Sequence, residues 1–504
     1  MFFKSIVAAL GAAAFLAPSA HAQDTCLNGS LSGTTNNRYT GAFFEVVTLK
    51  DTWLVEVKDL NNAAQAKADY ALSCDPLQTV LNPGSGWSLE YGVVQVPATA
   101  VGIIDKYAMT YIELLGKRTT IRKIQDPTMV VSPCIQKMLE TGQAKELSAT
   151  PDDTEAADLG VIVTPTTQGV PKAFLVQQDD NVEPLKRVEL IKLYSLLYNM
   201  PAEGDRIYNL IVDSYGNIQR SLVTIPDQNK KRIAWVRYDF PAQTWYLQTT
   251  AFAMKIIQAA GGVPMGNDDD LNSQTPREVA LQVQDLRYFL DNAQMVIDGT
   301  EFTPANLQGN ETPLDAWRRL AGYETNELPK IIEKRELYSL DREVNVNGTS
   351  SYKFRVAARP DLLLMDVVMA QYPDFDATYK MQFLREFATT EGPKVVYEAK
   401  DCPDPAQLTQ RDIVTVPNVR IYSGDNTTPP ALVGCTQYLD PSCSTGSSSK
   451  SGGVSTAVIV TVVVLAVVMA SVFAFFFRRW SRKTKEEAFI ELEDEMERDI
   501  PLRW

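Results

Sequence analysis

The most regular hydrophobic pattern in the chain lies at Asn181–Asn199, which reads NVEPLKRVELIKLYSLLYN. Pro184 suits the first position of a helix, where its missing N–H costs nothing, and Pro201 ends the run. Between them apolar residues recur every three positions, and further leucines fall on the other faces. A helix that is apolar nearly all round must pack on more than one side. We therefore predict a helix that lies between two bodies, with an ordinary core helix as the alternative interpretation.

Before this helix, strand and helix patterns alternate along the chain. Short apolar strands are predicted at Tyr91–Val96, Thr119–Ile124, Leu159–Thr164 and Ala173–Val176. Helices are predicted between them at Ile104–Gly116 and at Ser132–Gly142, the second with Ser132 as its N-cap. Nearer the N-terminus the pattern favours strands at Phe43–Leu49 and Thr52–Val57 and a helix at Ala63–Leu72. This alternation predicts a parallel sheet covered by helices.

A second alternation follows the long helix. The predicted helices are Glu203–Ile218, Trp245–Ala260, Leu286–Leu290, Ala316–Arg319 and Asp361–Gln371, and the predicted strands are Arg232–Tyr238, Ala293–Ile297 and Arg335–Leu340. The acidic stretch Asn267–Thr275 is expected to be a solvated loop. The predicted fold class is therefore α/β, with two Rossmann-like lobes bridged by a long helix. The expected boundaries are 23–182 for the N-lobe, 183–225 for the bridging helix and the helix after it, 226–391 for the C-lobe, and 392–453 for a cysteine-containing segment and stalk.

Both ends of the chain carry membrane-targeting patterns. Residues 1–22 contain a lysine, an apolar run and the small-x-small site Ala20-His21-Ala22 of a cleaved signal peptide. Val454–Phe477 is 24 residues without a charge, which spans roughly 36 Å as a helix and can cross a bilayer. Lys and Arg residues follow it, so the positive-inside rule places residues 478–504 in the cytosol. We expect a single transmembrane helix in the plasma membrane or an endomembrane, with the body of the protein on the extracellular or luminal side.

Composition narrows the chemistry. The net charge of −14 and the lack of a basic run with interleaved aromatic residues argue against nucleic acid as a partner. The one histidine of the sequence, His21, lies in the predicted signal peptide, so the mature chain would have no histidine for catalysis or metal ligation. Six cysteines between the signal and the membrane helix suggest up to three disulfides, and all fifteen pairings stay open. Four sequons, at Asn28, Asn310, Asn347 and Asn426, are compatible with a glycosylated surface. An enzyme is the least expected class of protein.

Four stretches, in this order, resemble segments of one protein family. They are VVSPCIQKMLETG (Val130–Gly142), VEPLKRVELIKLYSLLYN (Val182–Asn199), KRIAWVRYDFPAQTWYLQTTAFAMKIIQAAGG (Lys231–Gly262) and RPDLLLMDVVMAQYPD (Arg359–Asp374). The family is that of the periplasmic substrate-binding proteins for ferric siderophores and cobalamin, whose two α/β lobes are bridged by one long helix. The chain departs from the family at Tyr372-Pro373, where His-Pro is common. With a signal and a membrane helix added, it resembles the membrane-anchored, algal ferrichrome-binding form.

The resemblance implies a ligand held between the lobes, on loops that follow the strands. The side chains expected to bind it are Arg237, Tyr238, Phe240, Trp245, Tyr246, Ser132, Tyr338 and Arg355. Aromatic side chains suit the largely apolar exterior of a hydroxamate siderophore, and an arginine can donate to its oxygens. Because the siderophore would keep the iron wrapped, we expect no metal ligand from the protein and no covalently bound cofactor. For Trp245 and Tyr246 core packing is the alternative, and for Arg355 it is a surface salt bridge.

The function expected from these features is capture of a ferric siderophore, of a hydroxamate type such as ferrichrome, at the cell surface for iron uptake. A reductase or the endocytic machinery would be a further partner. Two other classes stay open. One is direct Fe(III) binding by tyrosines and carboxylates, as in transferrin-like surface proteins, and the other is an adhesion or signalling ectodomain with a vestigial cleft. Cobalamin or haem as the ligand also stays open.

Overall fold

The computed structural model describes residues 27–414, except for 28, 36, 50–51, 60–61, 75–91, 178, 180, 224, 267–276, 325, 389–391, 393 and 410. All of these belong to the first of two compact units, Met1–Tyr438, and the second unit is Leu439–Trp504. The predicted signal peptide, acidic loop, membrane helix and cytosolic tail lie outside the described residues. Within the described ranges, no helix combines the length and the apolar character that a membrane crossing requires.

The N-terminal part of the chain forms a sheet that the sequence only partly predicts. Its strands, in spatial order, are β1 (Arg38–Thr40), β2 (Phe44–Leu49), β3 (Thr52–Asp59), β4 (Asn62–Ser73) and β5 (Val93–Gln95). The prediction of a helix at Ala63–Leu72 is wrong, because this segment is β4. Alanine has the highest intrinsic helix propensity, but propensity is a weak guide that packing can override. Here pairing with β3 places Tyr70 opposite Val55 and Leu72 opposite Trp53, all buried. Cross-strand packing therefore overrides the local preference.

A parallel sheet in the first lobe is confirmed, but the predicted strand Tyr91–Val96 is not part of it, because this segment contains β5, which pairs with β4 of the N-terminal sheet. The strands of the parallel sheet lie in the order β10 (Ala173–Leu175), β9 (Val161–Thr164), β6 (Val101–Ile103), β7 (Ile121–Gln125) and β8 (Lys145–Leu147), and every pair is parallel. Two predicted helices are present as α1 (Ala108–Leu114) and α2 (Pro133–Glu140). The Ser132 side chain caps α2 by accepting a hydrogen bond from the backbone N–H of Ile135. Short 3₁₀ turns, η1 (Arg118–Thr120) and η2 (Pro127–Met129), flank β7.

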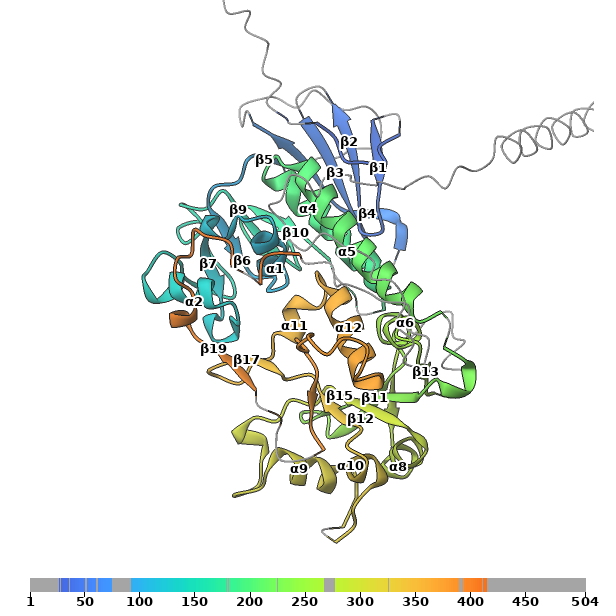
Figure 1. Ribbon diagram of the computed structural model, residues 1–504. Coiled ribbons are helices and arrows are strands. Elements are labelled where there is room, and N and C mark those ends of the chain that lie inside the picture. The colour runs from blue at the N-terminus through green and yellow to red at the C-terminus, as the bar shows by residue number, and fades with distance from the viewer. Residues whose placement is uncertain are drawn as a thin grey trace, which may run out of the picture. The chain divides into compact units, whose positions relative to one another are not determined.

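The connection between the lobes differs from the predicted one. Asn181–Asn199 is not one long helix but two short ones, α3 (Pro184–Val188) and α4 (Leu190–Leu197), and every residue of α4 is buried. The long helix is α5 (Pro201–Ser221), which runs down the molecule in Figure 1. Its first half places Ile207 and Ile211 in the core of the first lobe, and its second half places Tyr215 and Ile218 in the core of the second. The continuous bridge between the two cores is therefore α5.

The second lobe is built on a mixed sheet. Its order is β14 (Glu278–Leu281), β12 (Thr244–Gln248), β11 (Arg232–Asp239), β15 (Met295–Asp298), β16 (Leu337–Ser339) and β18 (Arg385–Glu386), with β13 (Val263–Pro264) paired to β11. Only β11, β15, β16 and β13 pair in parallel. The predicted helix Trp245–Ala260 is wrong in its first part, which is β12. Gln243, with φ of 50°, turns the chain so that β12 pairs antiparallel with β11, and α6 (Ala251–Ala259) begins after the capping residue Thr250.

Helices cover both faces of this mixed sheet. On β11, Ile233 and Trp235 face a core shared with α5, α6 and α12 (Pro360–Gln371), whereas Ala234 and Val236 face a separate core. That second core includes residues of α8 (Val283–Asn292), α9 (Pro313–Leu320) and α10 (Lys330–Glu333). The remaining short elements are η3 (Asp227–Asn229), η4 (Pro304–Asn306), α11 (Tyr352–Arg355) and η5 (Ala399–Asp401), and β17 (Glu343–Asn345) pairs in parallel with β19 (Val395–Tyr397). The chain is a mixed α/β protein in which parallel strands form the centre of each lobe.

Candidate functional site

A cavity lies where residues of the two lobes meet. The first lobe lines it with Met109, Thr110, Glu113, Leu114, Val131 and Ser132, the second with Ser351, Phe354 and Arg355, and the C-terminal segment with Arg411 and Asp412. α1 follows the carboxyl end of β6, and Ser132 follows that of β7, which is the edge where α/β proteins bind ligands. The cavity has a volume of about 30 Å³, enough for one or two water molecules. In this state the site is therefore nearly closed.

Ser132 holds together the first-lobe wall of the cavity. Its hydroxyl donates to Glu113 Oε1, while its oxygen accepts from the backbone N–H of Ile135 at 3.4 Å. Arg118 Nη1 lies 3.2 Å from the same Glu113 oxygen. Burial raises the pKa of Glu113, and the nearby Asp412 carboxylate raises it further, although Arg118 opposes both. Glu113 therefore takes up a proton more readily than a surface glutamate does.

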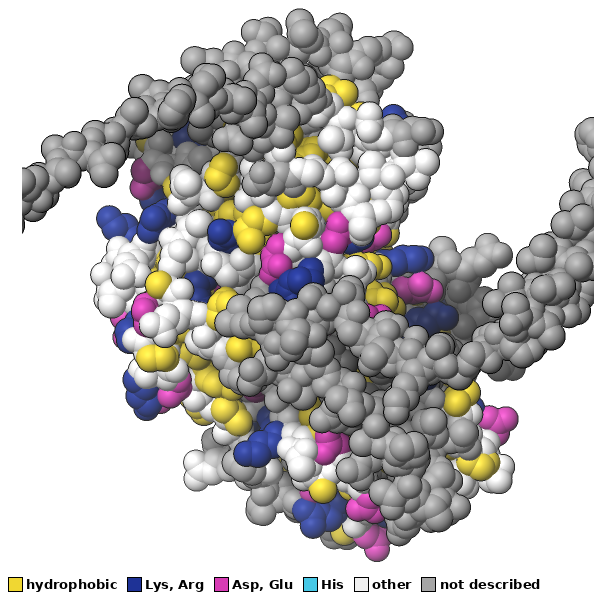
Figure 2. Space-filling model, turned by 45° about the horizontal axis from the view of Figure 1, so that its top comes forward, with side chains coloured by type: hydrophobic (Ala, Val, Ile, Leu, Met, Phe, Trp, Pro, Cys, Tyr) yellow, Lys and Arg dark blue, Asp and Glu magenta, His cyan; other side chains and the backbone are white. Residues whose placement is uncertain are grey.

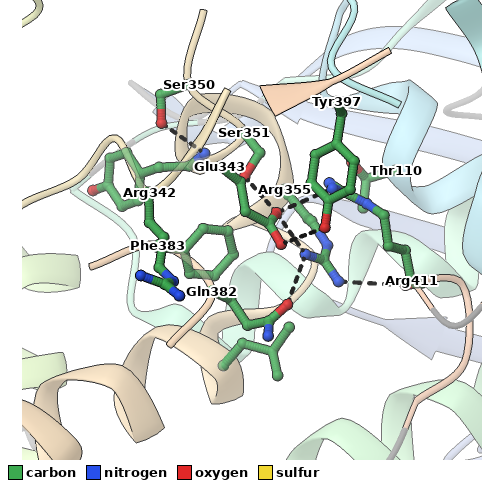
Figure 3. Close-up of polar contacts among 12 residues, drawn as sticks. Thr110, Arg342, Glu343, Ser350, Ser351, Arg355, Gln382, Phe383, Tyr397 and Arg411 are labelled. Atoms are coloured by element: carbon green, nitrogen blue, oxygen red, sulfur yellow. Dashed lines mark hydrogen bonds and ion pairs between the residues drawn. The ribbon is translucent and has the colours of Figure 1, made fainter. Parts of the chain in front are cut away.

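Glu343, at the start of β17, is the centre of the second-lobe side (Figure 3). Its Oε2 lies 3.1 Å from Arg355 Nη1 and 3.2 Å from Arg411 Nη1, and it accepts a 3.0 Å hydrogen bond from the Ser351 hydroxyl. Its Oε1 accepts from the Tyr397 hydroxyl at 3.2 Å. Burial alone would raise the pKa of Glu343, but the guanidinium groups of Arg411 and Arg355 hold it below its ordinary value. The carboxylate stays charged and binds two arginines from different segments.

Two predicted site residues, Ser132 and Arg355, thus meet at the cavity. The salt-bridge interpretation of Arg355 holds in a modified form, because the pair with Glu343 is buried rather than on the surface. Tyr338 lies elsewhere, on β16, where its hydroxyl donates to the Ala370 carbonyl at 3.4 Å and burial raises its pKa. It packs against the core shared with α12.

The other five predicted residues lie together on the β11–β12 hairpin, and none of them lines the described cavity. Arg237 pairs with Glu278 and with Asp239, and its guanidinium lies 4.7 Å from the centre of the Tyr246 ring. The Tyr238 ring packs edge-on against the rings of Phe240 and Trp245, with centroids 5.1 Å and 5.3 Å apart.

Trp245 itself is a core residue. It is 1% exposed, and its indole N–H donates to the Leu320 carbonyl at 3.0 Å. Its ring also lies edge-on to that of Trp317. The core-packing alternative therefore describes the position of Trp245, whereas a ligand-binding role for the other hairpin residues stays a prediction.

The sequence does not predict the other residues that line the cavity, among them the charged residues Glu113, Arg411 and Asp412, nor Glu343 beside it. Arg411 and Asp412 belong to the segment after residue 392, which shows no periodicity in the sequence. The one sequence feature that could have revealed this segment is Cys402, because its disulfide with Cys134 in α2 brings the segment to the first lobe. This pairing settles one of the questions that the sequence leaves open; Cys435 and Cys443 lie outside the described residues.

Outside this cavity, the described residues show two further features that bear on the choice of a site. Figure 2 shows positive and negative side chains interspersed over the described part of the face in view. Across the described ranges, no three His, Cys, Asp or Glu side chains lie close enough together to hold a metal ion. The interlobe cavity is therefore the candidate site.

No protein-family model and no curated protein matches the chain. Similar solved structures include Ceue of Helicobacter pylori with Ni(II) bound, at 11% identity over 57% of this chain and 88% of that one, with a TM-score of 0.39. A possible iron-binding, periplasmic solute-binding protein of Staphylococcus epidermidis is similar at 11% identity over 55% and 99%, with a TM-score of 0.39. The FhuD protein of S. pseudintermedius is similar at 11% identity over 54% and 91%, with a TM-score of 0.35. Periplasmic solute-binding proteins are the superfamily that the four sequence stretches resemble.

Proposed function

We propose that the chain is a solute-binding protein that takes its ligand between its two α/β lobes, and that the ligand is a ferric hydroxamate siderophore such as ferrichrome. The observation that carries this proposal is the cavity, which side chains from both lobes line beyond the carboxyl ends of β6 and β7. Its walls offer hydroxyl, guanidinium and carboxylate groups beside apolar ones. No catalytic step is required of them.

The size of the cavity sets a condition on this function. Pockets for ligands of this size measure roughly 300–1,000 Å³, and the cavity measures about 30 Å³. A siderophore can therefore enter only if the lobes move apart. In this proposal the structure is a closed form, and the ligand enters an open one.

The location follows from the sequence. Val454–Phe477 would anchor the protein in the plasma membrane or an endomembrane, and the lobes would face the extracellular or luminal side. The site would then face siderophore on the outer side of the membrane. The bound siderophore would pass to a reductase or enter the cell by endocytosis.

The small cavity also favours a second candidate. In an adhesion or signalling ectodomain the interlobe site would have been given up, and the lobes would stay closed permanently. The two candidates differ in one measurable property, which is saturable binding of a small ligand.

The test is equilibrium dialysis of the full chain in detergent against ferrichrome, ferrioxamine, cobalamin and Fe(III) citrate, with bound ligand measured by absorbance. We expect saturable binding of one hydroxamate complex. Thr110→Phe, which fills the cavity from α1, should weaken it roughly tenfold or more, equivalent to about 1.4 kcal/mol.

Trp245→Phe is the matched control, since Trp245 is an aromatic residue of the core outside the cavity lining, and it should leave affinity unchanged. Loss of binding in Trp245→Phe but not in Thr110→Phe would move the site to the β11–β12 hairpin. Binding of Fe(III) citrate alone would favour direct iron binding. No binding of any of the four would leave the ectodomain candidate.

A further inference from the structure

The segment after the second lobe crosses from one lobe to the other. We call residues 394–409 and 411–414 the strap. It begins on the second lobe, where β19 pairs in parallel with β17 and the Val395 N–H donates to the Arg342 carbonyl at 2.7 Å. Lys394 Nζ lies 2.8 Å from Asp341 Oδ2. The strap thus starts as an extra strand of the second lobe.

The strap then reaches the first lobe, where its attachment is covalent. Cys402 forms a disulfide with Cys134 in α2. Arg118, 3% exposed, donates from Nε to the Pro405 carbonyl at 2.8 Å and from Nη2 to Asp412 Oδ2 at 2.7 Å. A buried arginine and a disulfide together fix this part of the strap to the first lobe.

The strap finally returns to the second lobe at Glu343. Arg411 lies 3.2 Å from Glu343 Oε2, and its guanidinium lies 4.1 Å from the centre of the Tyr397 ring. Arg355 Nη2 donates to the Arg411 carbonyl at 3.4 Å. Because Arg411 and Asp412 also line the cavity, the strap forms a third wall of the site between the two lobes.

These two attachments differ in kind. The first lobe holds the strap through a covalent bond in addition to the Arg118 contacts. The second lobe holds it, apart from the continuity of the chain, through noncovalent contacts alone, which are the β17–β19 pairing, the Lys394–Asp341 ion pair and the contacts around Glu343. Any movement that enlarges the cavity must break contacts on one side of the strap. The noncovalent side is the one that can break and re-form with the disulfide intact.

We propose that the strap is a gate on the interlobe site, which stays on the first lobe through Cys134–Cys402 and releases from the second lobe at Glu343 when the site opens. The identity of the ligand that passes this gate rests on the proposed function above. The gate itself is a property of the ligand-free protein. It explains how a cavity of about 30 Å³ can belong to a protein that binds a much larger ligand.

The test is hydrogen-exchange mass spectrometry on the full chain in detergent with its disulfides intact. Glu343→Gln keeps the size of the side chain and removes the charge that holds both arginines. We expect exchange in peptides covering β17 and β19 to speed up roughly tenfold or more, because local opening becomes more frequent. Peptides covering α2 should keep their protection. Glu311→Gln is the matched control, since Glu311 forms a surface pair with Arg319 and does not contact the strap.

A second variant guards against misfolding. If Glu343→Gln does not fold, Arg411→Lys carries the test, because it keeps the charge and loses the planar contact with Tyr397. It should speed exchange at the same peptides by a smaller factor. Unchanged exchange at β19, or acceleration spread evenly over the chain in both variants, would overturn the proposal.

Ferrichrome titrations of the same samples separate the two proposals. Local acceleration without ferrichrome binding keeps the gate and removes the siderophore. Ferrichrome binding with an association rate that rises in Glu343→Gln supports both, whereas binding with no change in exchange or rate rejects the gate alone.

Discussion

Asp298, at the end of β15, should make the second lobe less stable as the pH rises. Its side chain is fully buried, and its Oδ1 accepts hydrogen bonds from the Thr300 N–H at 3.2 Å and from the Thr300 hydroxyl at 2.6 Å. Its Oδ2 has no hydrogen-bond partner among the described residues. Burial raises the pKa of Asp298 to about 7. The hydrogen bonds from Thr300 lower it, and the Asp341 carboxylate raises it, but burial has the largest effect. The carboxyl group is thus half protonated near neutral pH.

The size of the effect follows from the difference between the two states. The ordinary value is 3.8, and a difference of this size corresponds to roughly 4 kcal/mol between the charged and neutral forms. Since the folded state binds the proton more tightly, the stabilising contribution is complete below a pH of about 4 and is lost as the pH rises through about 7. Asp298→Asn is neutral at every pH and keeps an acceptor for Thr300. It should therefore be more stable than the parent by about 2–4 kcal/mol at about pH 8, and the gain should vanish at about pH 4.

Urea unfolding of parent and variant across this pH range, followed by tryptophan fluorescence, measures the difference. Asp366→Asn is the contrasting control: burial also raises the pKa of Asp366, to about 6, but its oxygens accept from the backbone N–H groups of Gln382, Phe383 and Leu384. The NH₂ group of an asparagine at this position would face these backbone N–H donors and could not accept their hydrogen bonds. This variant should therefore be less stable than the parent at every pH. An Asp298→Asn variant that is less stable than the parent by a constant amount across the range would refute the reasoning.

Two further pairs of variants test helix packing and a buried ion pair, each by urea unfolding. A Cβ at Gly204 would lie 2.5 Å from the Cβ of Ser195, so Gly204→Ala should push α5 away from α4 and lower the free energy of unfolding by about 1–3 kcal/mol. In Gly216→Ala, in the same helix, the new Cβ meets only a flexible arginine side chain. This variant should leave the free energy of unfolding unchanged or raise it by up to about 1 kcal/mol. Equal effects of the two would contradict this. Arg359→Met leaves the buried Asp361 carboxylate without its two 2.9 Å hydrogen bonds from the arginine and should lower the free energy of unfolding by about 3–5 kcal/mol. Adding Asp361→Leu should recover much of that loss, because it removes the unpaired charge. A double variant no more stable than the single one would show that the charge is not the cause.

The sequence predicts most elements of the parallel sheets, because a buried parallel strand is a short apolar run between turn residues. It fails where pairing with a distant or neighbouring strand decides the structure. The alanines of β4 favour a helix, and only the pairing of Tyr70 and Leu72 with β3 makes the segment a strand. The aromatic residues of β12 look like the start of α6, and only the turn at Gln243 separates them.

The bridge between the lobes could not be assigned from periodicity alone. The pattern of α4 shows that the helix is buried on all sides, but this is equally true of a helix inside one lobe and of one between two. The decisive fact is that Ile207 and Tyr215, eight positions apart on α5, belong to different cores. Membership of a core is a property of the folded protein, so the amphipathic pattern of α5 gives no hint of it.

The candidate site shows the same limit more sharply. Ser132 could be predicted because its cap and its place after a strand are local features. Glu343, Arg411 and the strap could not, because residues 134 and 402 are 268 positions apart and six cysteines allow fifteen pairings. The Cys134–Cys402 pair, had it been known, would have shown that the chain returns to the first lobe after the second. The returning segment would then be expected to lie beside the interlobe site. In the gate proposed above, the covalent bond keeps the strap on the first lobe, so the site opens at the second lobe, where the ion pairs of Glu343 are among the contacts that hold the strap.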